Sequence, residues 1–179
     1  MNFKSPNNFP FKKIWLILFC IISSLSLSYG VFENPGQKQD NISTGLSIST
    51  FDIDATPPVG SYMAYGRVIN TWDMGLRARG IVITGSGKPI VLCSVDWIGI
   101  ANDAQDEFKK VLADAAGTIP ERVTVHTIHQ HDAPICDFGA ERFLKKEGLD
   151  PLSYESTFTR SVMLNLGEAV HNSLKKAQP

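Results

Sequence analysis

Apolar positions along the chain recur with the period of β-strands in four segments. Residues 46–53 alternate apolar and polar side chains, as a half-buried strand does. Residues 78–84 and 122–128 predict two further strands. Residues 90–97 open with a nearly continuous apolar run, which predicts a strand that is buried on both faces.

Between the last two strands, apolar residues at helical spacing predict a helix over residues 102–116. Asn102 or Asp103 can cap its start, and Gly117 can end it. Strand, helix and strand in this order predict a βαβ unit, in which the strands at 90–96 and 122–128 are parallel neighbours.

The rest of the chain adds a loop and a second helix. Residues 132–149 are expected to form a loop, and Asp150 and Pro151 then favour a helix start. An apolar stripe from Phe158 to Leu174 predicts that this helix is long. The predicted fold class is therefore α/β, with a mixed sheet, a βαβ unit and packed helices.

Length and composition agree with one domain. The chain has 179 residues, 43% of them hydrophobic, which suits a single domain with a core. The net charge of −1 argues against nucleic acid as a partner. Three cysteines are too few for a disulfide scaffold, and pairing of Cys93 with Cys136 is left open.

The first residues have the parts of a secretory signal peptide. Three lysines precede a short apolar run over residues 14–22, and small residues follow up to Gly30. We expect residues 1–30 to be a signal peptide, 31–45 a linker, and 46–179 the folded domain. The protein is then secreted or periplasmic.

Three of the four histidines, His126, His129 and His131, lie within six residues. If the strand at 122–128 continues, His129 and His131 share one face and His126 lies on the other. Two imidazoles on one face can hold one metal, or one can bind metal while the other faces a substrate. His126 is expected to have a structural role or to support a ligand from behind, and His171 to lie at the surface.

Other polar residues follow the predicted strands. Asp96 ends the strand at 90–97, at the edge where His129 is expected, and could orient a metal-bound histidine or contact nearby backbone. Arg77 and Arg79 could grip an anion or lie solvated at the sheet edge. Glycines in residues 59–66 would let a ligand approach the backbone closely.

Four segments, in order, resemble the N-terminal domain of neutral/alkaline non-lysosomal ceramidases. Phe51–Gly60 resembles the opening Asp-Ile-Thr-Pro-Pro element, and Leu76–Arg79 resembles the Arg-Ala-Arg strand. Val91–Ile100 resembles the Val-Ser-x-Asp strand, and Ile128–Pro134 stands where the family has Thr-His-Thr-His-Ser-Gly-Pro. The resemblance covers residues 46–177.

The resemblance implies a zinc (Zn2+) hydrolase that cleaves the N-acyl amide bond of a ceramide-like lipid or another N-acyl amide. By position it makes His129 a zinc ligand and His131 the catalytic histidine beside the substrate. Gly60 approximately matches a substrate-binding glycine, and Asp96 is expected to support the zinc ligand. A lipid substrate also leaves open an association with a membrane surface.

The sequence departs from the family in two respects. Residues 132–136 replace the glycine-rich loop with Asp-Ala-Pro-Ile-Cys, so the substrate can differ from ceramide. The family's other zinc ligands, a histidine, a glutamate and a tyrosine, lie farther downstream than Pro179. We therefore expect the chain to be the N-terminal part of a larger ceramidase-like catalytic domain, truncated at its C-terminus.

Two alternatives remain beside a ceramidase-like amidase. One is a different metal hydrolase that uses His-x-His together with Asp132. The other is a non-catalytic secreted domain that binds lipid or glycan. Metal content and activity on an N-acyl lipid distinguish the three.

Overall fold

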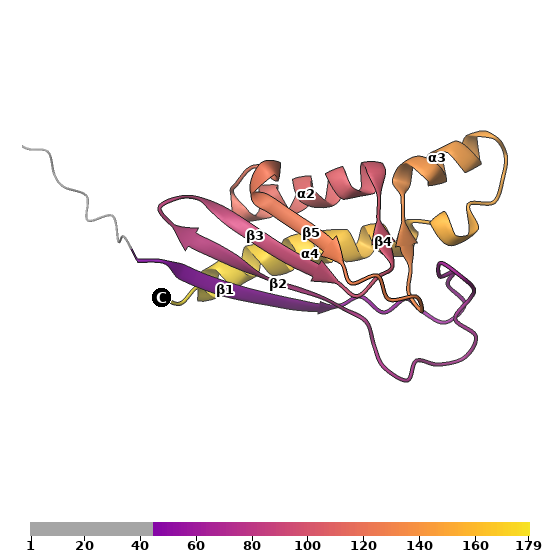
Figure 1. The fold of residues 1–179 in the computed structure, drawn as a ribbon, viewed down its shortest axis with the longest axis horizontal. Helices are drawn as coiled ribbons and strands as arrows, with labels where there is room; N and C mark the ends of the chain where they lie inside the picture. The colour runs from indigo at the N-terminus through magenta and orange to yellow at the C-terminus, as the bar shows by residue number, and fades with distance from the viewer. Residues whose placement is uncertain (1–44) are drawn as a thin grey trace, which may run out of the picture. The chain divides into compact units, whose positions relative to one another are not determined.

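A mixed four-stranded sheet organises the part of the chain that the structure, a computed structural model, describes, which is residues 45–179 (Figure 1). The strands are β1 (Ser47–Asp54), β2 (Arg77–Gly85), β3 (Gly87–Val95) and β5 (Val123–Thr127), in the order β1-β2-β3-β5. β1 and β2 pair antiparallel, as do β2 and β3, whereas β3 and β5 are parallel. The predicted α/β class with a mixed sheet is confirmed.

The predicted βαβ unit is present and is formed by β3, α2 (Asn102–Ala116) and β5. Gly117 ends α2 in the left-handed conformation, with a φ of 67°, and its amide donates to the carbonyl of Ala113. The predicted N-terminal cap is wrong, because Ala101 occupies that position and no side chain caps the helix. The side chain of Asn102 instead donates from Nδ2 to Asp137 Oδ2, at 2.6 Å.

The segment after β5 differs from the prediction. Part of the expected loop forms the short strand β6 (Ile135–Cys136), which pairs in parallel with β4 (Gly99–Ile100), and the helix α3 (Phe138–Lys146). The Asp137 carboxylate caps α3 by accepting from the amide of Ala140 at 3.0 Å. Asp150 and Pro151 precede only the 3-10 turn η2 (Leu152–Tyr154), and the long helix α4 begins later (Thr157–Ser173). Two further 3-10 turns are η1 (Pro120–Arg122) and η3 (Leu174–Lys176).

Helices α2 and α4 cover one face of the sheet, where α4 packs on β1 and α2 on β5 (Figure 1). The core lies between these layers. Its fully buried large side chains come from β2, β3, the helices and the segment that follows β3; they include Val82, Val91, Trp97, Phe108, Leu112, Phe138 and Leu166. Burying such side chains is the main favourable free-energy contribution to folding.

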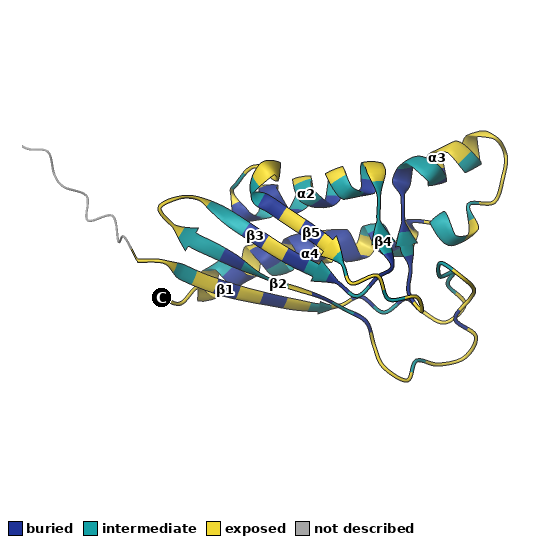
Figure 2. Cartoon of the chain, in the orientation of Figure 1, coloured by how far each residue is buried: buried dark blue, intermediate teal, exposed yellow. Residues whose placement is uncertain are grey.

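The opposite face of the sheet is partly open, so the prediction that β3 is buried on both faces is wrong. Figure 2 shows buried and exposed positions alternating along β1, β3 and β5. On β3, Val91 and Cys93 point into the core, whereas Leu92 is 40% exposed. β3 therefore has the burial pattern of a half-buried strand.

The predicted signal peptide and linker lie outside the described residues, apart from Gly45. Cys93 and Cys136 are free and buried, and burial raises the pKa of each thiol to about 12. Among residues 45–179, no helix has both the length and the apolar character that a membrane span requires.

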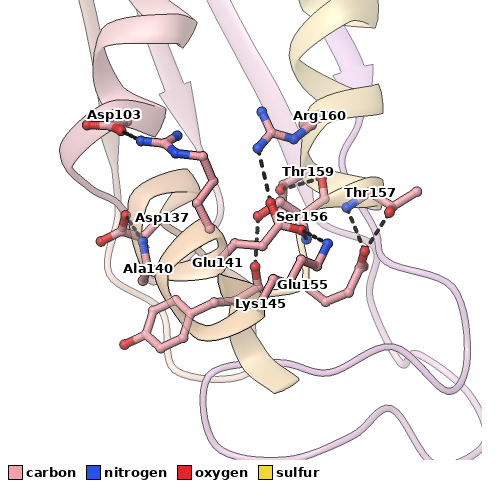
Figure 3. Close-up of polar contacts among 12 residues, drawn as sticks. Asp103, Asp137, Ala140, Glu141, Lys145, Glu155, Ser156, Thr157, Thr159 and Arg160 are labelled. Carbon is pink, nitrogen blue, oxygen red and sulfur yellow. Dashed lines mark hydrogen bonds and ion pairs between the residues drawn. The ribbon is translucent and has the colours of Figure 1, made fainter. Parts of the chain in front are cut away.

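A buried carboxylate joins α3 to α4. Figure 3 shows Glu141, which accepts hydrogen bonds from Lys145 Nζ at 2.7 Å, Arg160 Nη2 at 3.0 Å and the Ser156 amide at 3.1 Å. Burial alone would raise the pKa of Glu141, but these donors outweigh it and the pKa is lowered. The Arg160 guanidinium also lies 3.6 Å from the ring centre of Phe138.

Replacing Glu141 should therefore remove a pH-dependent part of the stability. Because its folded-state pKa is lowered, Glu141 stabilises the fold above the unfolded-state pKa, and this contribution is lost as pH falls through the folded-state value. Glu141→Gln should lower the free energy of unfolding by about 1–3 kcal/mol at pH 7. It should also flatten the fall in stability between neutral and acidic pH.

Urea denaturation at a series of pH values measures both effects. Glu168→Gln is the matched control, because Glu168 is exposed on the neighbouring helix α4. Equal stability and equal pH dependence in the two variants would show that Glu141 does not join the helices as described.

Candidate functional site

Trp97, the second residue after β3, connects the core to two loops. Its indole is fully buried and meets the ring of Phe108 edge-on, with 6.1 Å between ring centres. Its Nε1 donates to the carbonyl of Ala55 at 3.0 Å, and its own carbonyl accepts from the amide of His129 at 3.2 Å. One buried residue thus holds both the loop after β1 and the loop that carries the histidines.

His129 is presented by a turn and not by a strand. β5 ends at Thr127, and His129 has a φ of 59°, in the left-handed region that side chains other than glycine rarely adopt. The strand therefore does not continue to His131, and the shared strand face considered for His129 and His131 does not form. Strain of this kind persists only where surrounding contacts impose it.

The ring of His129 is oriented by a second carbonyl. Its Nδ1 lies 2.9 Å from the carbonyl oxygen of Ile98. Since a carbonyl oxygen only accepts, Nδ1 carries the proton of the neutral ring and Nε2 keeps its lone pair. A histidine held through one nitrogen in this way has the other nitrogen ready to bind a metal.

His131 lies beside His129, as predicted, although the turn and not a strand face brings them together. The two ring centres are 5.2 Å apart and the rings are nearly perpendicular. On its other side, the His131 ring lies 5.3 Å from the ring of Tyr65. Both histidines are exposed, so an incoming group could reach either ring.

The other two histidines lie elsewhere. His126 lies on β5, where it is exposed on the open face of the sheet. Its neighbour Val125 is buried and points to the opposite face. His171 is exposed on α4, as predicted for a surface residue.

Asp96 lies at the same end of the sheet as His129 but contacts other residues. Its Oδ2 accepts from the backbone amide of Arg77 and from Arg79 Nη2, both at 2.9 Å. Arg77 Nε pairs with Asp52 at 2.9 Å, so both arginines are engaged in ion pairs. The group that orients His129 is the carbonyl of Ile98, and a role for Asp96 in supporting a metal ligand stays a prediction.

Gly60 lies in a small pocket next to the histidine loop. Its φ of 91° requires glycine-like freedom, and its amide donates to the carbonyl of Val68 at 2.9 Å. The pocket has a volume of about 230 Å³, and its walls include Ser61, Pro134 and Phe158. Gly60 is exposed and lines this pocket, and its contact with a substrate stays a prediction.

A larger groove runs along the loop between β1 and β2. Its volume is about 970 Å³, and its walls include Ile69 and Met74, which are 88% and 80% exposed. From the histidine loop, Ile128, Gln130 and Asp132 contribute to these walls, whereas His129 and His131 do not. An apolar ligand in this groove would therefore lie next to the histidine loop without resting on the rings.

Tyr65 and the carbonyl of Ile98 were not foreseen as parts of the site. Tyr65 lies in residues 59–66, for which the sequence predicts only that a ligand could approach the backbone closely. The amide of the preceding residue, Ala64, donates to the carbonyl of Ala133 at 3.0 Å and brings the ring to His131. No local sequence pattern reveals such a contact.

The described donors suit part of a zinc site. His129 offers a lone pair on Nε2, and neutral imidazole is a common zinc ligand. Within residues 45–179, however, no cluster of three or more His, Cys, Asp or Glu side chains is arranged to hold a metal. A catalytic zinc site needs about three protein ligands, and the described residues do not bring three together.

Comparison with known proteins found no matching protein-family model and no matching curated protein. Solved structures that are similar to the chain include a neutral ceramidase from Pseudomonas aeruginosa and a ceramidase complexed with C2. Each has 19% sequence identity and a TM-score of 0.45, and the alignment covers 75% of this chain and 22% of theirs. The chain thus spans about a fifth of the length of those structures.

Shortening the Trp97 side chain should destabilise the fold and release the loop after β1 from its side-chain donor. Trp97→Phe removes the donor to Ala55 and leaves a gap beside Phe108, so the free energy of unfolding should fall by about 1–3 kcal/mol. Trp72→Phe is the control, because Trp72 donates to the carbonyl of Pro57 at 2.9 Å but is only half-buried. Urea denaturation should show the larger loss for Trp97, and the reverse order would contradict its central place.

Proposed function

We propose that the chain forms part of a zinc-dependent, ceramidase-like hydrolase that cleaves the N-acyl amide bond of a ceramide-like lipid. The observation that carries this proposal is the orientation of His129, whose Nδ1 faces the carbonyl of Ile98 while its ring lies 5.2 Å from that of His131. The ordered motifs between residues 51 and 134 support it.

Each histidine has its own role in this proposal. His129 contributes Nε2 to zinc, and further ligands come from groups beyond those that residues 45–179 bring together. Bound zinc supplies Lewis acidity, which polarises an amide carbonyl and acidifies water. His131 donates a hydrogen bond to the oxyanion that develops on the carbonyl, and an exposed ring next to His129 suits that task.

The substrate fits the surroundings of the loop. An N-acyl lipid has a long apolar part beside its amide, and the groove of about 970 Å³ has exposed apolar walls next to the histidine loop. Gly60 contacts the polar part of the substrate from the smaller pocket. Asp96 acts on the site indirectly, through the ion pair and backbone bond that hold β2.

One observation favours a non-catalytic lipid-binding domain as the second candidate. The groove receives side chains from the histidine loop, but neither His129 nor His131 lies in its walls. A domain that only binds lipid would need the groove and not the rings. Lipid binding without zinc and without hydrolysis would support this candidate.

The proposal also places the protein outside the cytoplasm, in a secreted or periplasmic form. The basic start and the apolar run over residues 14–22 favour export. Protein purified from its host should therefore begin near Val31, as measured by N-terminal sequencing. A soluble cytoplasmic protein that still begins at Met1 would contradict export.

Single substitutions of the histidines test the catalytic proposal. In protein purified from its host, His129→Ala should remove zinc and amide hydrolysis together, because it deletes a ligand. His131→Ala should retain zinc but lower kcat by about 10²–10³-fold, the cost of losing one donor to an oxyanion. His126→Ala is the control and should retain both, since His126 lies on the open sheet face.

Zinc content by metal analysis and hydrolysis of N-acyl sphingosine are the two measurements. If His129→Ala keeps full zinc and full activity, the assignment of His129 is wrong. If wild-type protein holds no zinc and hydrolyses no amide but binds the lipid, the binding domain is the better description.

A further inference from the structure

The turn that carries His131 is fixed at its two ends by backbone hydrogen bonds and in its middle by a side chain. On its N-terminal side, the His129 amide donates to the carbonyl of Trp97. On its C-terminal side, the carbonyl of Ala133 accepts from Ala64, and that of Pro134 accepts from Ile98 at 3.1 Å. Between these fixed points, residues 130–132 lie outside every strand and helix.

Gln130 bridges this interval with both ends of its amide. Its Oε1 accepts from the backbone amide of Asp132 at 2.6 Å, and its Nε2 donates to the carbonyl of Asp132 at 2.9 Å. The Asp132 amide belongs to the peptide bond that directly follows His131. One side chain therefore holds the backbone on the C-terminal side of the catalytic candidate.

We propose that Gln130 is a positioning residue for His131, an inference that rests on the proposed function of this histidine. With the Gln130 bridge in place, the His131 ring is kept between the rings of Tyr65 and His129, at 5.3 and 5.2 Å. Without the bridge, rotation about the φ and ψ angles of residues 130–132, the soft torsions of the backbone, would move the ring from this place. Small displacements of a reacting group cost large factors in rate.

The chemistry of the bridge requires a carboxamide of this length. An amide side chain offers a donor and an acceptor at once, whereas a carboxylate only accepts and a thioether does neither well. Gln130→Glu therefore keeps an acceptor for the Asp132 amide but loses the donor to its carbonyl. Gln130→Met keeps a similar length and loses both bonds.

Gln105 provides a matched control within the same βαβ unit. It lies on α2, and its Nε2 donates to the carbonyl of Val125 on β5 at 2.8 Å. Gln105→Met therefore removes an amide that supports the strand before the histidine loop but does not contact the turn itself. It reports what loss of a structural glutamine does without loss of the bridge.

The experiment measures the position of His131 directly and its consequence separately. Nuclear Overhauser effects between the imidazole protons of His131 and the ring protons of Tyr65 and His129 report the position in the full chain. Hydrolysis of N-acyl sphingosine by protein from its host gives kcat and KM. Circular dichroism verifies that each variant is folded.

Gln130→Met should abolish these ring contacts and lower kcat by up to about 10²-fold, with KM unchanged. Gln130→Glu should have an intermediate effect, and Gln105→Met should leave the ring contacts and kcat as in the wild type. Wild-type ring contacts in folded Gln130→Met would overturn the positioning role. If wild-type protein has no activity, the proposed function fails, whereas the ring contacts still decide whether Gln130 holds His131.

Discussion

The buried indole of Trp97 is the constraint on which the arrangement of the site depends. The ring fills the core beside Phe108, and its Nε1 fixes the carbonyl of Ala55 at the end of β1. The carbonyl of the same residue fixes the amide of His129. Because a buried polar group must find a partner, both hydrogen bonds are strongly favoured once the ring enters the core. Packing of one side chain thereby brings together loops that are far apart in sequence.

The far side of the histidine loop is fixed by a separate set of contacts. β4 pairs with β6, and the carbonyls of Pro134 and Cys136 accept from the amides of Ile98 and Ala101. α3 follows at once, and its Glu141 accepts from Arg160 of α4. The loop is therefore anchored to the sheet at one end and to the helical layer at the other. Such anchoring on rigid elements is what a site needs if its groups are to act in a defined geometry.

The two histidines and the apolar groove share a loop but not a surface. Gln130 and Asp132 form part of the groove wall, whereas the rings of His129 and His131 do not. A hydrolase that uses both features has to lead the amide of its substrate from the groove to the rings. A domain that uses the groove alone needs only the apolar walls, so the relation of these two features separates the catalytic proposal from the binding one.

The sequence by itself determined most of the sheet strands and the helix between β3 and β5, because their signals are local. Alternation and helical spacing predicted β1, β2, α2 and β5, and Gly117 was identified as the end of α2. α3 was missed, although Asp137 carries the signal of an N-terminal cap. The proximity of His129 and His131 was predicted from a strand that in fact ends at Thr127. Only the tertiary structure decided how His129 is held, what lies beside His131, and which face of β3 stays open. His129 is held by the carbonyls of Ile98 and Trp97, His131 lies beside Tyr65, and the helices pack on one face of the sheet only. These are contacts between segments that are distant in the sequence, and such contacts produce no periodic pattern of apolar and polar residues.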